Sequence, residues 1–218
     1  MTLWLTRVSP SLDHPNATRD FSDVNRLHQR IMELFPSDLG PNPRTAAGVL
    51  FRVETRHNGL AVLLQSTLKP TTTRWPPGYG QLQTIDLTPR LTTLHNGSTV
   101  RYRLLGNPSK QLPRGHTGPG KPGQRVPLHG DAAEQWWRAR AHTAGLTLHS
   151  AIMLPQNDLK GHTKKVHHAA ALYEGTATIH DPTTLRATIH NGIGRGKSHG
   201  CGLLSIAPLP NQNAQDGE

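Results

Sequence analysis

The 218-residue sequence has little cysteine, few aromatic residues, a deficit of acidic side chains and no long hydrophobic run. The single cysteine, Cys201, excludes an internal disulfide and suits a reducing compartment, so we expect a cytoplasmic protein. No apolar run approaches the roughly 18 residues of a membrane span, and residues 1–10 are too polar for a signal peptide, so no membrane partner is expected. Cys201 stands between two glycines and is expected to be buried rather than nucleophilic.

The deficit of acidic residues leaves a basic chain, with 24 Lys and Arg against 14 Asp and Glu and a net charge of +10. This balance favours a polyanion as partner, because each neutralised phosphate releases counterions. A charged, solvated surface is the alternative. Only 5% of the residues are aromatic, and no aromatic strand suited to base stacking is present. Contact with the phosphates of a folded RNA stem is therefore favoured over stacking of single-stranded bases.

Hydrophobic periodicity and turn signals divide the chain into two successive units with the same order of elements. We expect strands at 3–8, 47–56, 60–68, 81–87, 98–107, 146–154, 166–175 and 200–209, and helices at 20–36, 131–145 and 181–192. The order predicts an α+β fold with two tandem ferredoxin-like (RRM-like) βαββαβ domains. The expected division is residues 1–90, a linker at 91–97, residues 98–210 and a disordered tail at 211–218.

The first predicted helix places a histidine within its apolar stripe. Asp20 or Ser22 is expected to cap this helix, and Pro36 to end it. At roughly 100° per residue, His28 falls between Val24 and Ile31 on the apolar face. A histidine there is either a satisfied core residue or a partly desolvated acid or base at the edge of a groove. Because imidazole titrates near neutrality, the second interpretation suits proton transfer in RNA cleavage.

A glycine-rich segment near the end of the chain, IHNGIGRGKSHGCGLLSIAPLP, resembles a phosphate-binding loop but matches none of the known ones. Counted back from GKS, the first P-loop glycine falls on Asn191. The segment also leaves a helix and enters a strand, which is the reverse of a P-loop. What is left is a glycine-rich turn whose backbone N–H groups and cations, Arg195 and Lys197, could bind phosphates. A helix C-cap followed by glycines needed for strand packing is the alternative.

Other basic residues agree with RNA contact. Plain solvent exposure explains Arg101 and Arg103 equally well, and a solvated turn is the alternative for Lys160, Lys164 and Lys165. In strand 98–107, Arg101 and Arg103 alternate with apolar residues and should share one face. Residues 108–130 are predicted to be a mobile basic loop, and residues 155–165 a second basic loop between strands. The predicted RNA-binding residues are Arg101, Arg103, Lys110, Lys160, Lys164, Lys165, Gly194, Arg195, Gly196, Lys197 and Ser198.

Metal chemistry is not expected from the sequence. The cluster HTKKVHH offers His162, His167 and His168, but no carboxylate accompanies them, and lysines surround them. Neither HExxH nor paired CxxC motifs occur. We therefore expect no metal and no cofactor.

Several motifs together resemble the CasE family, the CRISPR-associated endoribonucleases of type I-E systems. They are RDFSDVNRLHQRIMELFP, FRVETR, VLLQS, YRLLGNPSK and NGIGRGKSHGCGLLSIAPL, which occur in the family's order over most of residues 1–210. The resemblance implies two ferredoxin-like domains and metal-independent cleavage of CRISPR precursor RNA at the base of the repeat hairpin. It also implies retention of the mature crRNA hairpin, and assembly with other Cas subunits into the RNA-guided surveillance complex.

By position, His28 matches the catalytic histidine of the family, and the resemblance implies attack by a ribose 2′-hydroxyl to give a 2′,3′-cyclic phosphate. The family often has a tyrosine three residues earlier, where this chain has Asn25, which cannot exchange a proton. Either another residue assists, with Tyr79, Ser198 and His199 as candidates, or the chemistry depends more heavily on His28. A non-catalytic subunit that only binds the RNA hairpin is the rival interpretation.

Overall fold

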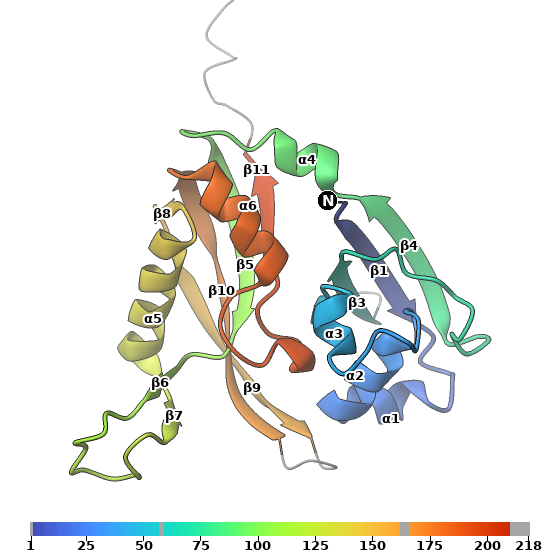
Figure 1. Cartoon of the computed structure of the whole chain (residues 1–218), viewed down its shortest axis with the longest axis horizontal. Helices are drawn as coiled ribbons and strands as arrows, with labels where there is room; N and C mark the ends of the chain where they lie inside the picture. Colours follow the sequence, from blue (N-terminus) through green and yellow to red (C-terminus); the bar gives the residue numbers. More distant parts are fainter. Residues whose placement is uncertain (1, 57–58, 162–165, 210–218) are drawn as a thin grey trace, which may run out of the picture.

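A computed structural model describes residues 2–56, 59–161 and 166–209, and consists of two α+β units that lie side by side (Figure 1). In the first unit, the sheet has the order β2-β3-β1-β4, with β1 antiparallel to both β3 and β4. Its strands are β1 (Trp4–Pro10), β2 (Leu50–Arg56), β3 (Gly59–Ser66) and β4 (Gly80–Asp86), and its helices are α1 (Ala17–Phe21), α2 (Val24–Met32) and α3 (Pro43–Ala46). This strand order is that of the predicted ferredoxin-like unit.

The second unit has the matching sheet order, β11-β5-β10-β8, with β9 paired to β10. Its strands are β5 (Thr99–Gly106), β6 (Ser109–Gln111), β7 (Arg125–Pro127), β8 (Leu146–Leu148), β9 (Ile152–Gly161), β10 (Val166–Ile179) and β11 (Leu204–Pro208). Its helices are α5 (Gly130–Thr143), α6 (Pro182–Asn191) and the 3-10 turn η1 (Lys197–His199), while α4 (Thr88–Thr92) joins the units. The predicted α+β class with two ferredoxin-like units is confirmed.

The predicted helix 20–36 is in fact two helices, α1 and α2, and its predicted caps are wrong. The break falls at Ser22 and Asp23, where Asp23 is extended (φ −140°, ψ 117°). Its carboxylate accepts hydrogen bonds from the backbone N–H groups of Asn25 and Arg26, at 2.8 and 3.4 Å. Asp23, rather than Asp20 or Ser22, is therefore the N-cap of α2. For the helix predicted at 131–145, Asp131 with Glu134 three residues later is the cap expected from the sequence. This cap is also wrong, because α5 begins at Gly130 and Asp131 lies in its first turn.

Two predicted loops contain strands. The segment 108–130 forms the hairpin β6–β7, and most of the segment 155–165 belongs to β9, with 162–165 outside the described residues. The single strand predicted at 146–154 is divided into β8 and β9. Between β8 and β9 the backbone N–H groups of His149 and Ser150 both donate to the Thr176 carbonyl oxygen, at 2.9 and 3.3 Å, which interrupts the regular pairing with β10. The expected tail, 211–218, lies outside the described residues.

Each unit has its own hydrophobic core. Leu27, Ile31 and Leu34 anchor α2 and the turn after it to the first sheet, and Trp137 of α5 is the largest buried side chain of the second core. Burying such side chains stabilises a fold by about 1.5–3 kcal/mol each. No helix in the described part of the chain is long and apolar enough to cross a membrane.

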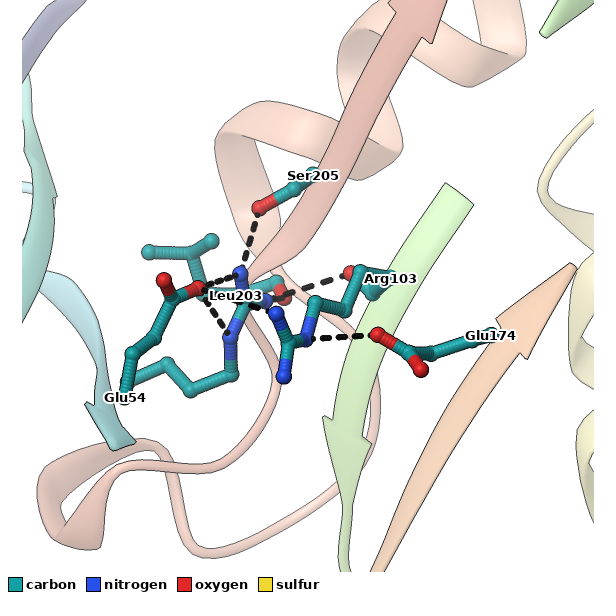
Figure 2. A network of polar contacts seen from close by, with 6 residues as sticks. Glu54, Arg103, Glu174, Leu203 and Ser205 are labelled. Carbon is teal, nitrogen blue, oxygen red and sulfur yellow. Dashed lines mark hydrogen bonds and ion pairs between the residues drawn. The ribbon is translucent and has the colours of Figure 1, made fainter. Parts of the chain in front are cut away.

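The two units are joined by a buried arginine on β2 (Figure 2). The Arg52 side chain is 2% exposed and pairs with Glu54 at 2.7 Å. Across the junction, it donates to the carbonyl oxygens of Leu203 and Arg103, at 3.0 and 3.2 Å, and to the Ser205 hydroxyl at 2.9 Å. Burial lowers the pKa of Arg52, and the Glu54 carboxylate opposes that change. Arg52 therefore fixes the first sheet against β5 and β11 of the second.

Cys201 is buried, as predicted, and burial raises the pKa of its thiol to about 12. Because the thiolate is the reactive form, we expect native protein at neutral pH to resist alkylation by iodoacetamide. Modification should begin only when the chain is unfolded in denaturant. Mass spectrometry before and after unfolding measures this, and rapid alkylation of the native protein would contradict it.

Candidate active site and basic surfaces

The histidine predicted from the helical pattern lies where the two units meet. His28 is half-buried on α2, and its Nδ1 atom is buried. The turn η1, in the middle of the glycine-rich segment, packs against α2 and β2 (Figure 1). The structure therefore brings together two segments that lie far apart in the sequence, the helix with His28 and the turn with Lys197, Ser198 and His199.

Asn25 lies beside His28 on α2 but turns its side chain inward. It is 7% exposed, and its amide nitrogen is buried without a hydrogen-bond partner among the described residues. Tyr79, another predicted assistant, is 1% exposed. Its ring packs edge-on against Trp75 at 4.9 Å and under the guanidinium of Arg30 at 5.0 Å. Burial raises the pKa of Tyr79, so the phenol is a poor proton donor, and its neighbours cover it.

The glycines of the segment are needed for its backbone path. Gly192, Gly194, Gly196, Gly200 and Gly202 all have positive φ. At Gly202 (φ +93°) a Cβ would lie 2.8 Å from the Ile193 carbonyl oxygen. The segment also closes on itself, since Ile193 N–H donates to the Gly202 carbonyl and Cys201 N–H to the Gly196 carbonyl, at 2.9 and 3.1 Å. The packing alternative for the glycines is therefore supported, and the cations remain the segment's candidates for phosphate contact.

The two cations of the segment have different surroundings. Arg195 is exposed to solvent. The Nζ of Lys197 donates to the carbonyl of Asn191, the last residue of α6, at 2.7 Å. Burial, and then the neighbouring charge of Arg44, lower the pKa of Lys197. Lys197 thus satisfies a carbonyl at the helix C-terminus, and Arg195 is the better placed of the two to meet an anion.

Beside the start of α2 lies a groove of about 660 Å³. Phe21, Ser22 and Val24 line one side, and β9 lines the other through Asp158 and Lys160. The groove places Lys160, one of the predicted RNA-binding residues, opposite the helix that carries His28. Lys164 and Lys165, which are predicted with it, lie outside the described residues.

A second basic surface lies on the other face of the second sheet. Val100, Tyr102 and Leu104 are buried in the core, so Arg101 and Arg103 face away from it and line a groove of about 400 Å³. Arg101 is exposed, but Arg103 pairs with Glu174 at 2.9 Å and approaches Glu54 at 3.9 Å (Figure 2). Two carboxylates therefore offset the charge of Arg103. Lys110 is exposed on the β6–β7 hairpin, which projects away from α2 (Figure 1).

The sequence analysis did not identify the buried polar side chains that join the two units and that contact η1. Arg52 and Glu54 alternate within FRVETR, and a pair of opposite charges on one face of a predicted strand was the available signal. Asn107 and His168, which lie beneath η1, carry no such signal, because their partners come from different elements. Within 2–56, 59–161 and 166–209, no group of three or more His, Cys, Asp or Glu side chains is arranged to hold a metal ion.

Comparison with known proteins identifies the relatives of the chain. The family described as "CRISPR associated protein" matches residues 3–208. The Cascade subunit CasE of Escherichia coli is 33% identical over 86% of this chain and 93% of its own length. The CRISPR-associated endoribonuclease Cse3 of Thermus thermophilus is 27% identical over 94% of this chain and 100% of its own. A structure of Thermus thermophilus Cse3 bound to an RNA representing a pre-cleavage complex matches with a TM-score of 0.82 at 26% identity, covering 95% of this chain and 100% of that one.

Proposed function

The chain belongs to the CasE family of CRISPR-associated endoribonucleases, and from that premise we propose that it cuts CRISPR precursor RNA at the base of the repeat hairpin and keeps the product bound. The observation that carries the proposal is the packing of η1, which holds Lys197 and His199, against α2, the helix that holds His28. The rival function, RNA binding without cleavage, uses the same surfaces but makes no use of His28.

The chemistry is a transesterification within the RNA. The ribose 2′-oxygen loses its proton and bonds to the adjacent phosphorus, the bond from phosphorus to the 5′-oxygen breaks, and that oxygen gains a proton. The products are a 2′,3′-cyclic phosphate and a 5′-hydroxyl. His28 supplies one of the two proton transfers, and a cation such as Arg195 stabilises the extra negative charge on the phosphate.

Cleavage of repeat RNA in excess EDTA tests the proposal. Purified protein should cut at one position, and the upstream product should carry the cyclic phosphate, which acid converts to a 2′- or 3′-phosphate. Intact RNA under these conditions would contradict the enzyme function. If RNA is nevertheless bound tightly, the rival binding function takes its place.

Removing the exposed cation of the glycine-rich segment should weaken RNA binding. We expect Arg195→Ala to lower the affinity for RNA about fivefold near physiological salt, because one phosphate contact is lost. The slope of log affinity against log salt concentration should become shallower by about one. Filter binding over a range of salt concentrations measures both. Arg138→Ala is the control, since that arginine is already paired with Glu134 at 2.7 Å on α5. Equal affinities and slopes for wild type and R195A would remove Arg195 from the RNA-binding surface.

The proposal extends to the location of the protein, its RNA-binding surface and its division into domains. We place it in the cytoplasm, as a subunit of a type I-E surveillance complex, in keeping with its similarity to the Cascade subunit CasE. The RNA-binding surface is proposed to include Arg101, Lys160 and Arg195, with the remaining predicted residues as secondary contacts. The division into residues 1–90 and 98–210 is retained as a proposal, with α4 at the junction.

A further inference from the structure

A third groove, of about 500 Å³, lies where α3 of the first unit meets the end of α6 of the second (Figure 1). We call it the junction groove. Its polar lining side chains come from both units: Arg44, Thr45 and Thr67 from the first, and His190 and Asn191 from the second. No Asp or Glu is among the lining residues that the structure describes. The junction groove therefore collects hydrogen-bond donors from two units without a carboxylate to meet them.

The guanidinium of Arg44 is held in place at this groove. Its Nη1 donates to the Val49 carbonyl oxygen at 2.9 Å, and its Nη2 donates to the Thr45 hydroxyl oxygen at 2.8 Å. These two bonds leave further guanidinium N–H groups for another acceptor, and the Thr45 hydroxyl can donate its own hydrogen as well. Arg44 is half-buried, burial lowers its pKa, and it forms no ion pair with any described residue. It is thus a rigid, partly desolvated cation beside a neutral groove wall.

A second cation adds to the positive potential of the junction groove. Lys197 of η1 donates through Nζ to the carbonyl of Asn191, which lines the groove. Burial, and then the charge of Arg44, lower the pKa of Lys197, so the two cations are close enough to repel each other. Like charges held together without a carboxylate destabilise the fold, and an anion bound beside them offsets that cost. The arrangement therefore favours an anion as the ligand of the junction groove.

We propose that the junction groove binds a phosphate of the repeat RNA other than the one that is cut, with Arg44 as its principal ligand. The proposal rests on the RNA binding proposed above. α6 ends at Asn191, and the glycine-rich turns that lead to η1 follow at once. Because phosphates follow one another along a strand, an RNA that contacts η1 can place a neighbouring phosphate in the groove. His28 is not among the lining residues, so this phosphate lies apart from the proposed chemistry.

Removing the charge of Arg44 should weaken RNA binding in a salt-dependent way. Filter binding uses repeat RNA with a 2′-deoxyribose at the cut position, which cannot be cleaved. We expect Arg44→Gln to lower the affinity about fivefold near physiological salt, and the slope of log affinity against log salt concentration to become shallower by about one. Arg44→Lys keeps the charge and should keep the slope. Arg186→Gln is the matched control, because Arg186 also donates to backbone carbonyls, those of Leu91 and Leu94, but does not line the groove.

An uncharged phosphate analogue identifies the phosphate that is bound. Methylphosphonate linkages are placed one at a time along the RNA, each with a 2′-deoxyribose. At one position away from the cut, the analogue should weaken binding by the wild type about fivefold but have little effect on R44Q, because both changes remove the same contact. R186Q should respond like the wild type at every position. Thr45→Val, on the exposed side of α3, removes only a neutral donor and should lower the affinity about threefold with the slope unchanged.

The outcomes separate this inference from the cleavage function. Equal affinities and slopes for the wild type and R44Q would refute the phosphate site, as would a methylphosphonate profile that is the same for both. If R44Q binds inorganic phosphate less well but RNA equally well, the groove takes free anions and the assignment to RNA is overturned. Thermal melting of each variant shows that it is folded, and T45V tests the same site if R44Q is not. Cleavage of unmodified RNA in EDTA decides the endoribonuclease function independently, since a protein that binds without cutting loses that function and keeps the site.

Discussion

His28→Ala should slow RNA cleavage by about 10²- to 10⁴-fold, which is the usual contribution of one proton-transfer group. Affinity for the repeat RNA should stay close to that of the wild type, because His28 is half-buried on α2 and carries no permanent charge. Single-turnover cleavage with excess protein measures the chemical step, and filter binding measures the affinity. The pattern expected is therefore a loss of rate without a loss of binding.

The matched control is Gln29→Ala, the exposed neighbour on the same helix. It perturbs α2 to the same degree but should leave the rate unaltered. A fully active H28A protein would remove His28 from the chemistry, while a protein that loses binding and rate together would make it a residue of the RNA-binding surface. Only loss of the rate alone agrees with proton transfer.

Arg52→Ala should destabilise the protein by about 3–5 kcal/mol, the cost of breaking a buried ion pair. The substitution leaves the Glu54 carboxylate, which is 8% exposed, without its closest cation. It also removes the donor for Leu203, Arg103 and Ser205 across the junction. For a chain of this size, the melting temperature should fall by about 6–20 °C. Calorimetry or circular dichroism measures the change.

Replacing both members of the pair tests the cause. Arg52→Met with Glu54→Leu leaves no buried charge unpaired, and most of the lost stability should return. Arg138→Met, which removes an exposed arginine paired with Glu134 on α5, should cost less than about 1 kcal/mol. If R52A melts like the wild type, Arg52 does not hold the two units together. A double variant as unstable as R52A would assign the loss to packing instead of charge.

The order of strands could be predicted from the sequence, because alternation and turn residues act locally. Alternation in TVRYRLLG correctly separated Arg101 from the buried Val100 and Tyr102. The helix boundaries could not be predicted as well. Asp20, Ser22 and Asp23 are all good capping residues, and only the arrangement of α1 against α2 selects Asp23. The hairpin β6–β7 was missed because three-residue strands leave almost no periodic signal.

The candidate site was predictable in part. Features that depend on neighbouring residues of one helix could be predicted, whereas contacts between residues far apart in the sequence could not. His28 could be singled out because its helix shows the apolar stripe around it. That Arg103 faces two carboxylates could not, since Glu54 and Glu174 come from other strands. That the Lys197 Nζ donates to the Asn191 carbonyl could not be predicted either, because this contact depends on how the segment folds back on α6. The connection of His168 to His199 likewise depends on the tertiary fold.

The meeting of α2 with η1 has a consequence for the protein during its synthesis. The helix with His28 leaves the ribosome early, within a unit that has its own core. The turn with His199 and the strand β11, against which Arg52 docks, are made last. A nascent chain therefore carries a folded first unit without a complete site. Because the proposed site needs η1 as well as α2, we expect cleavage activity only from chains long enough to fold the second unit.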